Sequence, residues 1–286
     1  MHPVAASVVA AYLDAVDAEA PGLVEGLYLT GSAALGDFRP RTSDVDFVAV
    51  TARPLDDGAL AALARAHARL RARHPRPFFD GLYATWADLA GDPALRRGPH
   101  SQEGRFHPES RGPGDPVTWH TVARYGVACR GPAPTDIAVS ADPAALAAWT
   151  LDNLDRYWGR LLRGASRLSD RWGLGALAPY GAVWIVLGVA RLHYTLATGA
   201  LCSKTAAGEY ALRAFPEARW QRVVAECLRI RRADRAGPGV SGALRASAAD
   251  LLDLASARSL YRSPLARRRD VLAFGAMVTE DARARP

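Results

Sequence analysis

The chain has 286 residues, and about half of them are apolar, which is enough for two modest domains that each bury a core. Its net charge of +7 comes almost entirely from arginine, and no compact basic run with interleaved aromatic residues precedes the C-terminal region, so we do not expect a nucleic-acid partner. No segment approaches about 20 uninterrupted apolar residues, and the N-terminal region is acidic, so we expect a cytoplasmic protein without membrane contact.

The first half of the chain alternates helical and β-prone segments. Residues 4–20 have apolar positions at helical spacing and stop at Pro21-Gly22, and residues 56–73 form a second helix rich in Ala and Leu. Because a helical crossover returns the chain to the same sheet, the run after the second helix is expected to lie in the same sheet as the run before it. The three β-prone runs cover residues 27–30, 44–50 and 77–84.

The most informative stretch is Gly31-Ser32, followed by eleven residues and then Asp44-Val45-Asp46. Side chains alternate along a strand, so Asp44 and Asp46 would leave the same face and repel each other unless a cation lies between them. Mg²⁺ takes one or two carboxylates together with phosphate oxygens, and Gly31 and Ser32 offer a phosphate close backbone approach and a hydroxyl. Each motif alone is usually a turn or a strand edge, but their order and spacing together predict a nucleotide-metal site.

Residues 31–50, GSAALGDFRPRTSDVDFVAV, resemble the signature of the polymerase β-like nucleotidyltransferase superfamily. They are similar in particular to the adenylyltransferases that modify streptomycin and spectinomycin. The resemblance implies two Mg²⁺ ions at Asp44 and Asp46, and ATP phosphates held at Gly31 and Ser32. It further implies transfer of AMP to a hydroxyl of an aminoglycoside or aminocyclitol, with release of pyrophosphate. The motif does not identify the acceptor.

Asp80 lies inside the third β-prone run, where a charge is unexpected. One interpretation is a turn, because Asp-Gly is a common hairpin signal. The resemblance implies another, in which Asp80 is a third carboxylate that helps to bind metal and accepts the proton of the acceptor hydroxyl. Many relatives carry the longer Glu there. We favour the functional interpretation.

Residues 87–114 are rich in Gly, Pro, His and charge, which predicts a long loop with little regular structure. Four side chains in it have no metal-ligand spacing, and we expect them to be solvated: His100, Glu103, His107 and Glu109.

Residues 117–129 resemble the end of the family's nucleotidyltransferase domain. Trp119 and His120 are the candidates in this segment for contact with the substrate. Two interpretations of His120 stay open: it binds substrate or assists proton transfer, or it is a packed core histidine.

A boundary is expected at 138–143, which divides the chain into a nucleotidyltransferase domain (1–140) and a helical domain that binds substrate and ATP (141–286). The predicted class is therefore α+β: a small mixed sheet with helices, followed by an α-helical bundle. A last basic helix is expected after Pro264. The other helices predicted for the second domain cover residues 144–162, 180–198, 206–215, 216–232 and 243–261, with a loop at Gly237-Pro238-Gly239.

Lys204 is the only lysine of the chain, and in a sequence whose other basic side chains are arginine it suggests a place that needs a compact ammonium group. Residues 190–216, ARLHYTLATGALCSKTAAGEYALRAFP, are similar to a helix-loop-helix of the adenylyltransferases in which an Arg, a Thr-Gly turn and a Lys recur at this spacing. The resemblance implies that Arg191 and Lys204 contact the ATP phosphates.

The start of that helix departs from the family. Relatives that take streptomycin place acidic residues about ten positions before the Arg, where this chain has Gly181, with Tyr180 and Trp184 nearby. Four other acidic residues are candidates to hold a cationic acceptor: Asp152, Asp155, Asp170 and Glu209.

Other function classes also remain open. One is a nucleotidyltransferase that modifies a protein partner, as in toxin-antitoxin pairs, and another is a non-catalytic nucleotide-binding module. A nucleic-acid 3′-end nucleotidyltransferase ranks lower. We expect a monomer, and Cys129, Cys202 and Cys227, which match no disulfide or metal spacing, are expected to be buried thiols.

Overall fold

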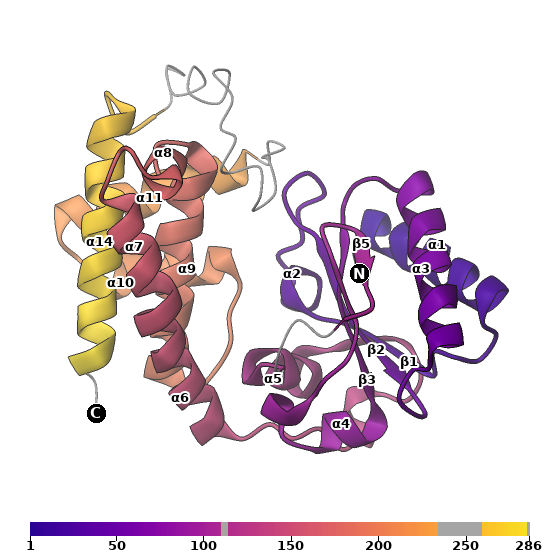
Figure 1. The fold of residues 1–286 in the computed structure, drawn as a ribbon. Coiled ribbons are helices and arrows are strands. Elements are labelled where there is room, and N and C mark those ends of the chain that lie inside the picture. The colour runs from indigo at the N-terminus through magenta and orange to yellow at the C-terminus, as the bar shows by residue number, and fades with distance from the viewer. Residues whose placement is uncertain (110–113, 234–258, 285–286) are drawn as a thin grey trace. The chain divides into compact units, whose positions relative to one another are not determined.

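The computed structural model describes residues 1–109, 114–233 and 259–284 (Figure 1). It divides into two compact units, Met1–Leu146 and Ala147–Pro286, with the division inside helix α6 (Pro143–Asn153). The first unit contains a mixed sheet with helices, and the second is helical. The predicted α+β class, with the sheet first and the helices second, is therefore confirmed.

Six strands of the first unit form one sheet, in the order β5-β4-β3-β2-β1-β6. Strands β2 and β3 are parallel, and the other neighbouring pairs are antiparallel. The parallel pair is joined through helix α3, so the predicted crossover is confirmed. The strands are β1 (Gly26–Leu29), β2 (Val45–Thr51), β3 (Phe79–Thr85), β4 (His100–Gln102), β5 (Arg105–His107) and β6 (Val127–Arg130).

The two faces of this sheet are covered by different helices. Helices α1 (Pro3–Glu19) and α3 (Asp57–Arg73) lie on one face of the sheet (Figure 1). Their apolar side chains cluster with alternate strand residues such as Phe47 of β2. Val48 of β2 lies in the opposite cluster, together with residues of the short helix α4 (Trp86–Ala90) and of α5 (Pro116–Tyr125). Because side chains alternate along a strand, Asp46 has the orientation of Val48 and lies on the face that α5 covers.

The prediction of a long loop at residues 87–114 is wrong in its central part. Among its described residues are helix α4, a 3-10 turn (Pro93–Leu95) and the hairpin β4-β5, which extends the sheet beside β3. Each of the two strands has only three residues, too few for an alternating apolar pattern. The hairpin is held by Ser101, whose hydroxyl donates to Phe79 O at 2.8 Å, and by Phe106, whose ring stacks on His67.

The second unit follows the predicted helices closely, with two differences. The predicted helix 144–162 is divided by a π-helical turn (Leu154–Trp158), and a short helix α8 (Arg171–Gly175) was not predicted. Most of the predicted helix 243–261, and the loop Gly237-Pro238-Gly239, lie outside the described residues. Among the described residues of this unit, the other helices are α7 (Gly159–Ala165), α9 (Pro179–Thr198), α10 (Lys204–Ala214), α11 (Ala218–Arg232) and α14 (Pro264–Ala284).

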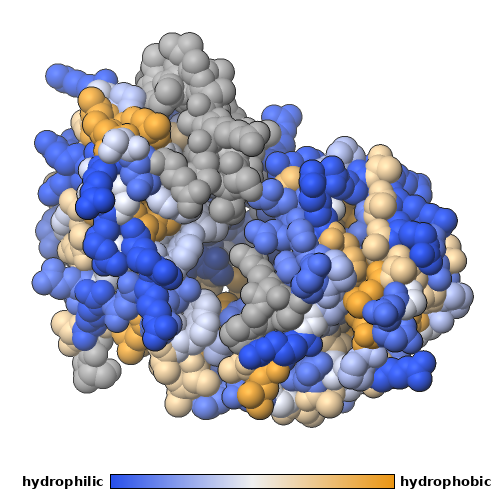
Figure 2. Space-filling view, viewed as in Figure 1, coloured by the Kyte–Doolittle hydropathy of each residue, from blue (hydrophilic) through white to orange (hydrophobic). Residues whose placement is uncertain are grey.

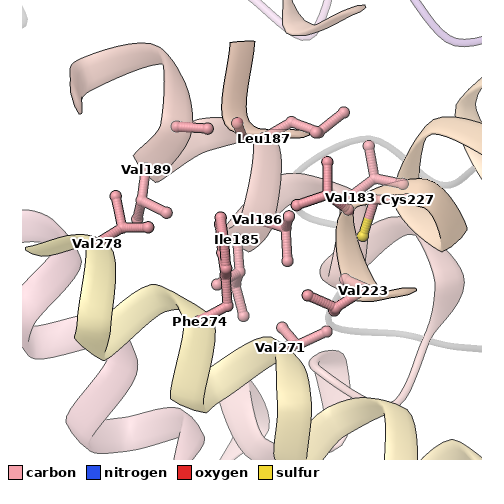
Figure 3. Close-up of a cluster of buried hydrophobic side chains, with 14 of the residues drawn as sticks. Val183, Ile185, Val186, Leu187, Val189, Val223, Cys227, Val271, Phe274 and Val278 are labelled. Atoms are coloured by element: carbon pink, nitrogen blue, oxygen red, sulfur yellow. The ribbon is translucent and has the colours of Figure 1, made fainter. Parts of the chain in front are cut away.

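Helix α9 forms the centre of the helical unit. It contacts α10, α11 and α14, and its apolar side chains pack against Val223, Val271 and Phe274 of these neighbours (Figure 3). By length and composition α9 could cross a membrane, but half of its most apolar window is buried inside the unit. The helix is therefore explained as the core of the bundle.

A buried carboxylate joins α11 to the start of α14. The side chain of Glu226 is fully buried and accepts hydrogen bonds from Arg229, from the Ser259 hydroxyl and from the Leu260 amide. Burial opposes its ionisation, but these hydrogen bonds outweigh burial and hold the pKa of Glu226 below its ordinary value. The ionised carboxylate therefore stabilises the folded state.

We expect this contribution to be fully present above the unfolded-state pKa, about 4.3, and to be lost as the pH falls through the lower folded-state pKa. Glu226→Gln should lower the free energy of unfolding by about 3 kcal/mol at pH 7, because it breaks a buried charged network. The variant should also lose less free energy of unfolding than wild type when the pH is lowered. Denaturant unfolding at pH 7 and pH 3 tests this, with exposed Glu217→Gln as the control. Equal acid sensitivity of Glu226→Gln and wild type would contradict it.

Candidate functional site

The predicted carboxylates lie where β2 and β3 begin. Asp46 is the second residue of β2 and is the direct partner of Asp80 on the parallel strand β3. Neighbouring strands are about 4.8 Å apart, and paired residues project from the same face, so the two carboxylates lie close together. Asp44 immediately precedes β2. The structure thus brings together the acidic residues that the sequence singled out.

Gly31 lies directly against Asp46. The turn after β1 is held by a hydrogen bond of 2.9 Å from the Thr30 amide to Asp46 O, and Gly31 has a φ of +55°. A Cβ on residue 31 would overlap the Asp46 carboxylate. Glycine is therefore required both for the left-handed backbone and for the space that the carboxylate fills.

Ser32 follows in the short helix α2 (Gly31–Ala34). Its Oγ is buried and makes no hydrogen bond within the described parts of the chain. A buried hydroxyl without a partner is uncommon, because desolvation is then uncompensated. This hydroxyl is available to a ligand oxygen at the position where the sequence predicted a phosphate.

Asp80 is held by the turn of the β4-β5 hairpin. Its two carboxylate oxygens accept hydrogen bonds of 2.8 Å from the backbone amides of Glu103 and Gly104. Both turn residues have positive φ, 52° and 66°, which is costly for Glu. Burial raises the pKa of Asp80 to about 6 against these two hydrogen bonds, and the charges of Asp44 and Glu103 add to the rise. At pH 7 Asp80 is mainly ionised and can accept a proton.

The sequence did not identify the role of this turn. Glu103 was expected to be a solvated side chain, and its backbone amide instead orients Asp80. Glu-Gly is a weak hairpin signal compared with Asn-Gly. Every residue except proline has a backbone amide, so the residue type does not indicate which amide binds a side chain. A hairpin tip over Asp80 was therefore not predictable from composition.

Asp44 is partly exposed and lies 3.9 Å from Arg76, measured from Oδ1 to Nη1. Within the described ranges, no three His, Cys, Asp or Glu side chains are placed so that they could hold a metal ion together. The expected trio of Asp44, Asp46 and Asp80 is therefore not arranged as a closed cage, and each oxygen of Asp80 already accepts one amide hydrogen bond while keeping a further lone pair. Mg²⁺ usually binds one or two carboxylates with substrate phosphates, so the Asp44 and Asp46 pair remains suitable for it.

The two candidates on α5 differ in their surroundings. Trp119 is fully buried among residues of the sheet and donates from Nε1 to Asp88 O, so it is a core residue and is not placed to touch a substrate. His120 is also buried, with Nδ1 3.1 Å from Pro116 O. A carbonyl only accepts, so Nδ1 carries the proton, and Nε2 is an acceptor without a partner in the described structure. That nitrogen suits a ligand hydroxyl.

The second unit places Arg191 and Lys204 beside the same connection. Arg191 of α9 donates from Nε to Cys202 O at 3.1 Å, and Lys204 is the first residue of α10. The Lys204 ammonium lies over the Trp184 ring, 4.9 Å from its centroid.

The three cysteines are free thiols. Cys202 and Cys227 are buried as expected, whereas Cys129 is only partly buried.

Gly181 has a steric explanation. A Cβ at this position would overlap the carbonyl oxygen of Gly175, where the connection from α8 meets α9. No acidic side chain could stand there without moving the backbone. Tyr180 and Trp184, whose rings are stacked at 6.1 Å, occupy this end of α9 instead.

The sheet with Gly31-Ser32 and paired carboxylates at one end defines a nucleotidyltransferase. A family model described as nucleotidyltransferase domain matches residues 10–84, and one described as the C-terminal domain of aminoglycoside adenylyltransferase matches residues 170–253. Together the two matches cover more than half of the chain. The chain belongs to the aminoglycoside adenylyltransferase family and is an enzyme of the nucleotidyltransferase class.

A solved structure has the same fold. The chain is similar to the spectinomycin adenyltransferase AAD(9) from Enterococcus faecialis, crystallised with ATP and spectinomycin, with a TM-score of 0.59 and 12% identity. The similarity covers 93% of this chain and 98% of the other. Comparison with curated protein sequences gives no match.

Proposed function

We propose that the enzyme transfers AMP from ATP to a hydroxyl of an aminoglycoside or aminocyclitol antibiotic and releases pyrophosphate. The observation that carries the proposal is the direct pairing of Asp46 with Asp80, with Gly31 packed against the Asp46 carboxylate. In this proposal Asp46 is a metal ligand, Asp80 is the proton acceptor and Gly31 belongs to a phosphate-binding turn. The AAD(9) structure with ATP and spectinomycin supports both substrates.

Each residue has a separate role in this proposal. Gly31 and Ser32 bind triphosphate oxygens, and the unpartnered Ser32 hydroxyl donates to one of them. Asp80, fixed by the hairpin turn, accepts the proton of the attacking hydroxyl. Arg191 and Lys204 neutralise charge on the pyrophosphate leaving group. His120 contributes Nε2 as an acceptor for a substrate hydroxyl.

Asp44 and Asp46 would hold two Mg²⁺ ions together with phosphate oxygens. Carboxylates are hard ligands that match this ion, and their mutual repulsion favours a cation between them. Bound there, the ions would supply charge neutralisation of the triphosphate and a lower pKa for the attacking hydroxyl. The three free cysteines are consistent with the proposed location in the reducing cytoplasm, and we propose a monomer.

Mass spectrometry of a panel of aminoglycosides and aminocyclitols, incubated with the enzyme, ATP and Mg²⁺, tests the function. We expect one AMP to be added to at least one compound, with spectinomycin the first to try. No adduct on any compound, from protein that still binds ATP, would overturn the acceptor class. Stable complex formation with adenylylation of a protein would favour the protein-modifying alternative.

We expect Lys204→Ala to weaken ATP binding by roughly 1.5 to 3 kcal/mol, the range for a hydrogen bond to a charged group. The ammonium lies over the Trp184 ring, so its removal also exposes an aromatic face. Calorimetric titration with ATP measures the change. Lys204→Arg keeps the positive charge and should lose less ATP affinity than Lys204→Ala. The exposed Arg213→Gln on α10 is the control. An unchanged ATP affinity in Lys204→Ala would remove this residue from the site.

A further inference from the structure

Positive charge is concentrated in the helical unit. Residues 147–286 contain 22 Arg and Lys against 12 Asp and Glu, whereas residues 1–146 contain 14 against 17. The nucleotidyltransferase unit is therefore slightly acidic, and the excess charge of the chain lies in the helical unit. Hydrophilic residues also dominate the visible surface of that unit (Figure 2). Such asymmetry points to anionic ligands of the basic part.

Three arginines of this unit converge on one carboxylate. Asp270 of α14 is fully buried, and its Oδ1 accepts from Arg219 Nε at 2.8 Å and lies 3.4 Å from Arg269 Nε. Its Oδ2 accepts from Arg222 Nη2 at 2.8 Å and from the Tyr261 hydroxyl at 2.9 Å. The guanidinium groups thus surround a single carboxylate group, and the three arginines with Asp270 carry a net charge of +2.

Joining the two helices does not require all three arginines. One guanidinium would neutralise Asp270, and Arg219 and Arg222 both reach it from α11. Arg269 is the neighbour of Asp270 on α14, so its contact cannot join α14 to another helix. Like charges this close repel one another, and the repulsion is relieved when an anion binds among them.

The arginines are exposed and already oriented. The exposed fractions of the Arg219, Arg222 and Arg269 side chains are 43%, 47% and 72%, so each of them is accessible to a ligand from solvent. Arg219 also lies over the Trp220 ring at 4.9 Å. Arg222 lies over the Tyr261 ring at 4.7 Å. Guanidinium groups held by a carboxylate and by aromatic faces lose less rotamer entropy when they bind a ligand.

We propose that Arg219, Arg222 and Arg269 form an anion site between α11 and α14 that binds a small phosphate ligand, phosphate or pyrophosphate. Planar guanidinium groups match phosphoryl oxygens in pairs, and three of them held beside one another by Asp270 suit a multiply charged oxyanion. Asp270 organises the site and makes no contact with the ligand. The site belongs to the helical unit alone and does not depend on the proposed reaction.

Titration of the full chain with sodium pyrophosphate at about 0.15 M salt, followed by calorimetry, tests the site. Arg222→Gln and Arg269→Gln are each expected to weaken binding about tenfold, as expected for loss of a charge-assisted hydrogen bond. Arg213→Gln, an exposed arginine of α10, should leave it unchanged. Pyrophosphate can also bind where ATP binds. The site between α11 and α14 is therefore identified by the difference in pyrophosphate affinity between these variants and wild type.

Trp220 provides a local signal, because it packs on Arg219. We expect pyrophosphate to change tryptophan emission, and the change should be lost in Trp220→Phe. Arg222→Gln could disturb the packing of α11 on α14, but Arg269 is largely exposed, so Arg269→Gln remains a fair test. Wild-type affinity in Arg269→Gln would overturn the proposal. So would arginine-dependent binding of an RNA duplex without binding of pyrophosphate, which would make the ligand a nucleic-acid backbone.

Discussion

Asp46→Asn is expected to lower the rate of AMP transfer at least about 10³-fold while the first unit keeps its fold. An amide is a poor ligand for Mg²⁺ and carries no charge to balance it, so the triphosphate would lose its principal anchor at this end of the sheet. The fold should persist because Asn has the same shape. The hydrogen bond from Thr30 is also made to the backbone oxygen of Asp46.

Product formation measured by mass spectrometry at saturating ATP and Mg²⁺, together with thermal unfolding, tests this expectation. Asp14→Asn, which removes an exposed carboxylate of α1, is the matched control and should keep full activity. Turnover by Asp46→Asn at the wild-type rate, with an unchanged melting temperature, would end the assignment of Asp46 as a metal ligand.

The part of this site that the sequence predicted depends on local spacing. Gly31-Ser32 and Asp44-Val45-Asp46 are short motifs on segments whose strand character is clear from their apolar pattern, and their relation is set by one turn. The presence of β2 and β3 in one sheet was also predictable, because a helical crossover separates them. That Asp80 lies beside Asp46 was implied by the resemblance to the superfamily, and the pairing of the two residues agrees with it.

The rest of the site depends on contacts that a sequence pattern does not encode. The hairpin over Asp80 is two strands of three residues, and its orienting groups are backbone amides. Trp119 and His120 are adjacent on one helix, so their different surroundings follow from the rotation of α5 against the sheet. Gly181 departs from the family pattern, and only the packing of Gly175 on α9 explains why.

Removal of the proposed proton acceptor, Asp80, is also expected to have a large effect on kcat. Asp80→Asn should lower kcat about 10² to 10⁴-fold, the range for loss of a general base, and leave ATP binding nearly unchanged. The two turn amides both donate to the Asp80 carboxylate, so the amide nitrogen of Asn would face a donor. Some local loss of order around residue 80 is therefore expected in this variant.

Glu103→Asn tests whether the charge of the turn contributes to the reaction. Asn adopts positive φ more readily than Glu, so the turn and both amide donors should be preserved while the Glu103 charge is removed. We expect this variant to keep kcat within a few-fold of wild type, which would show that the Glu103 charge is not required. His120→Ala completes the comparison, because His120 is the other group able to accept a proton. If kcat falls in His120→Ala and not in Asp80→Asn, the base is His120, and Asp80 only shapes this end of the sheet.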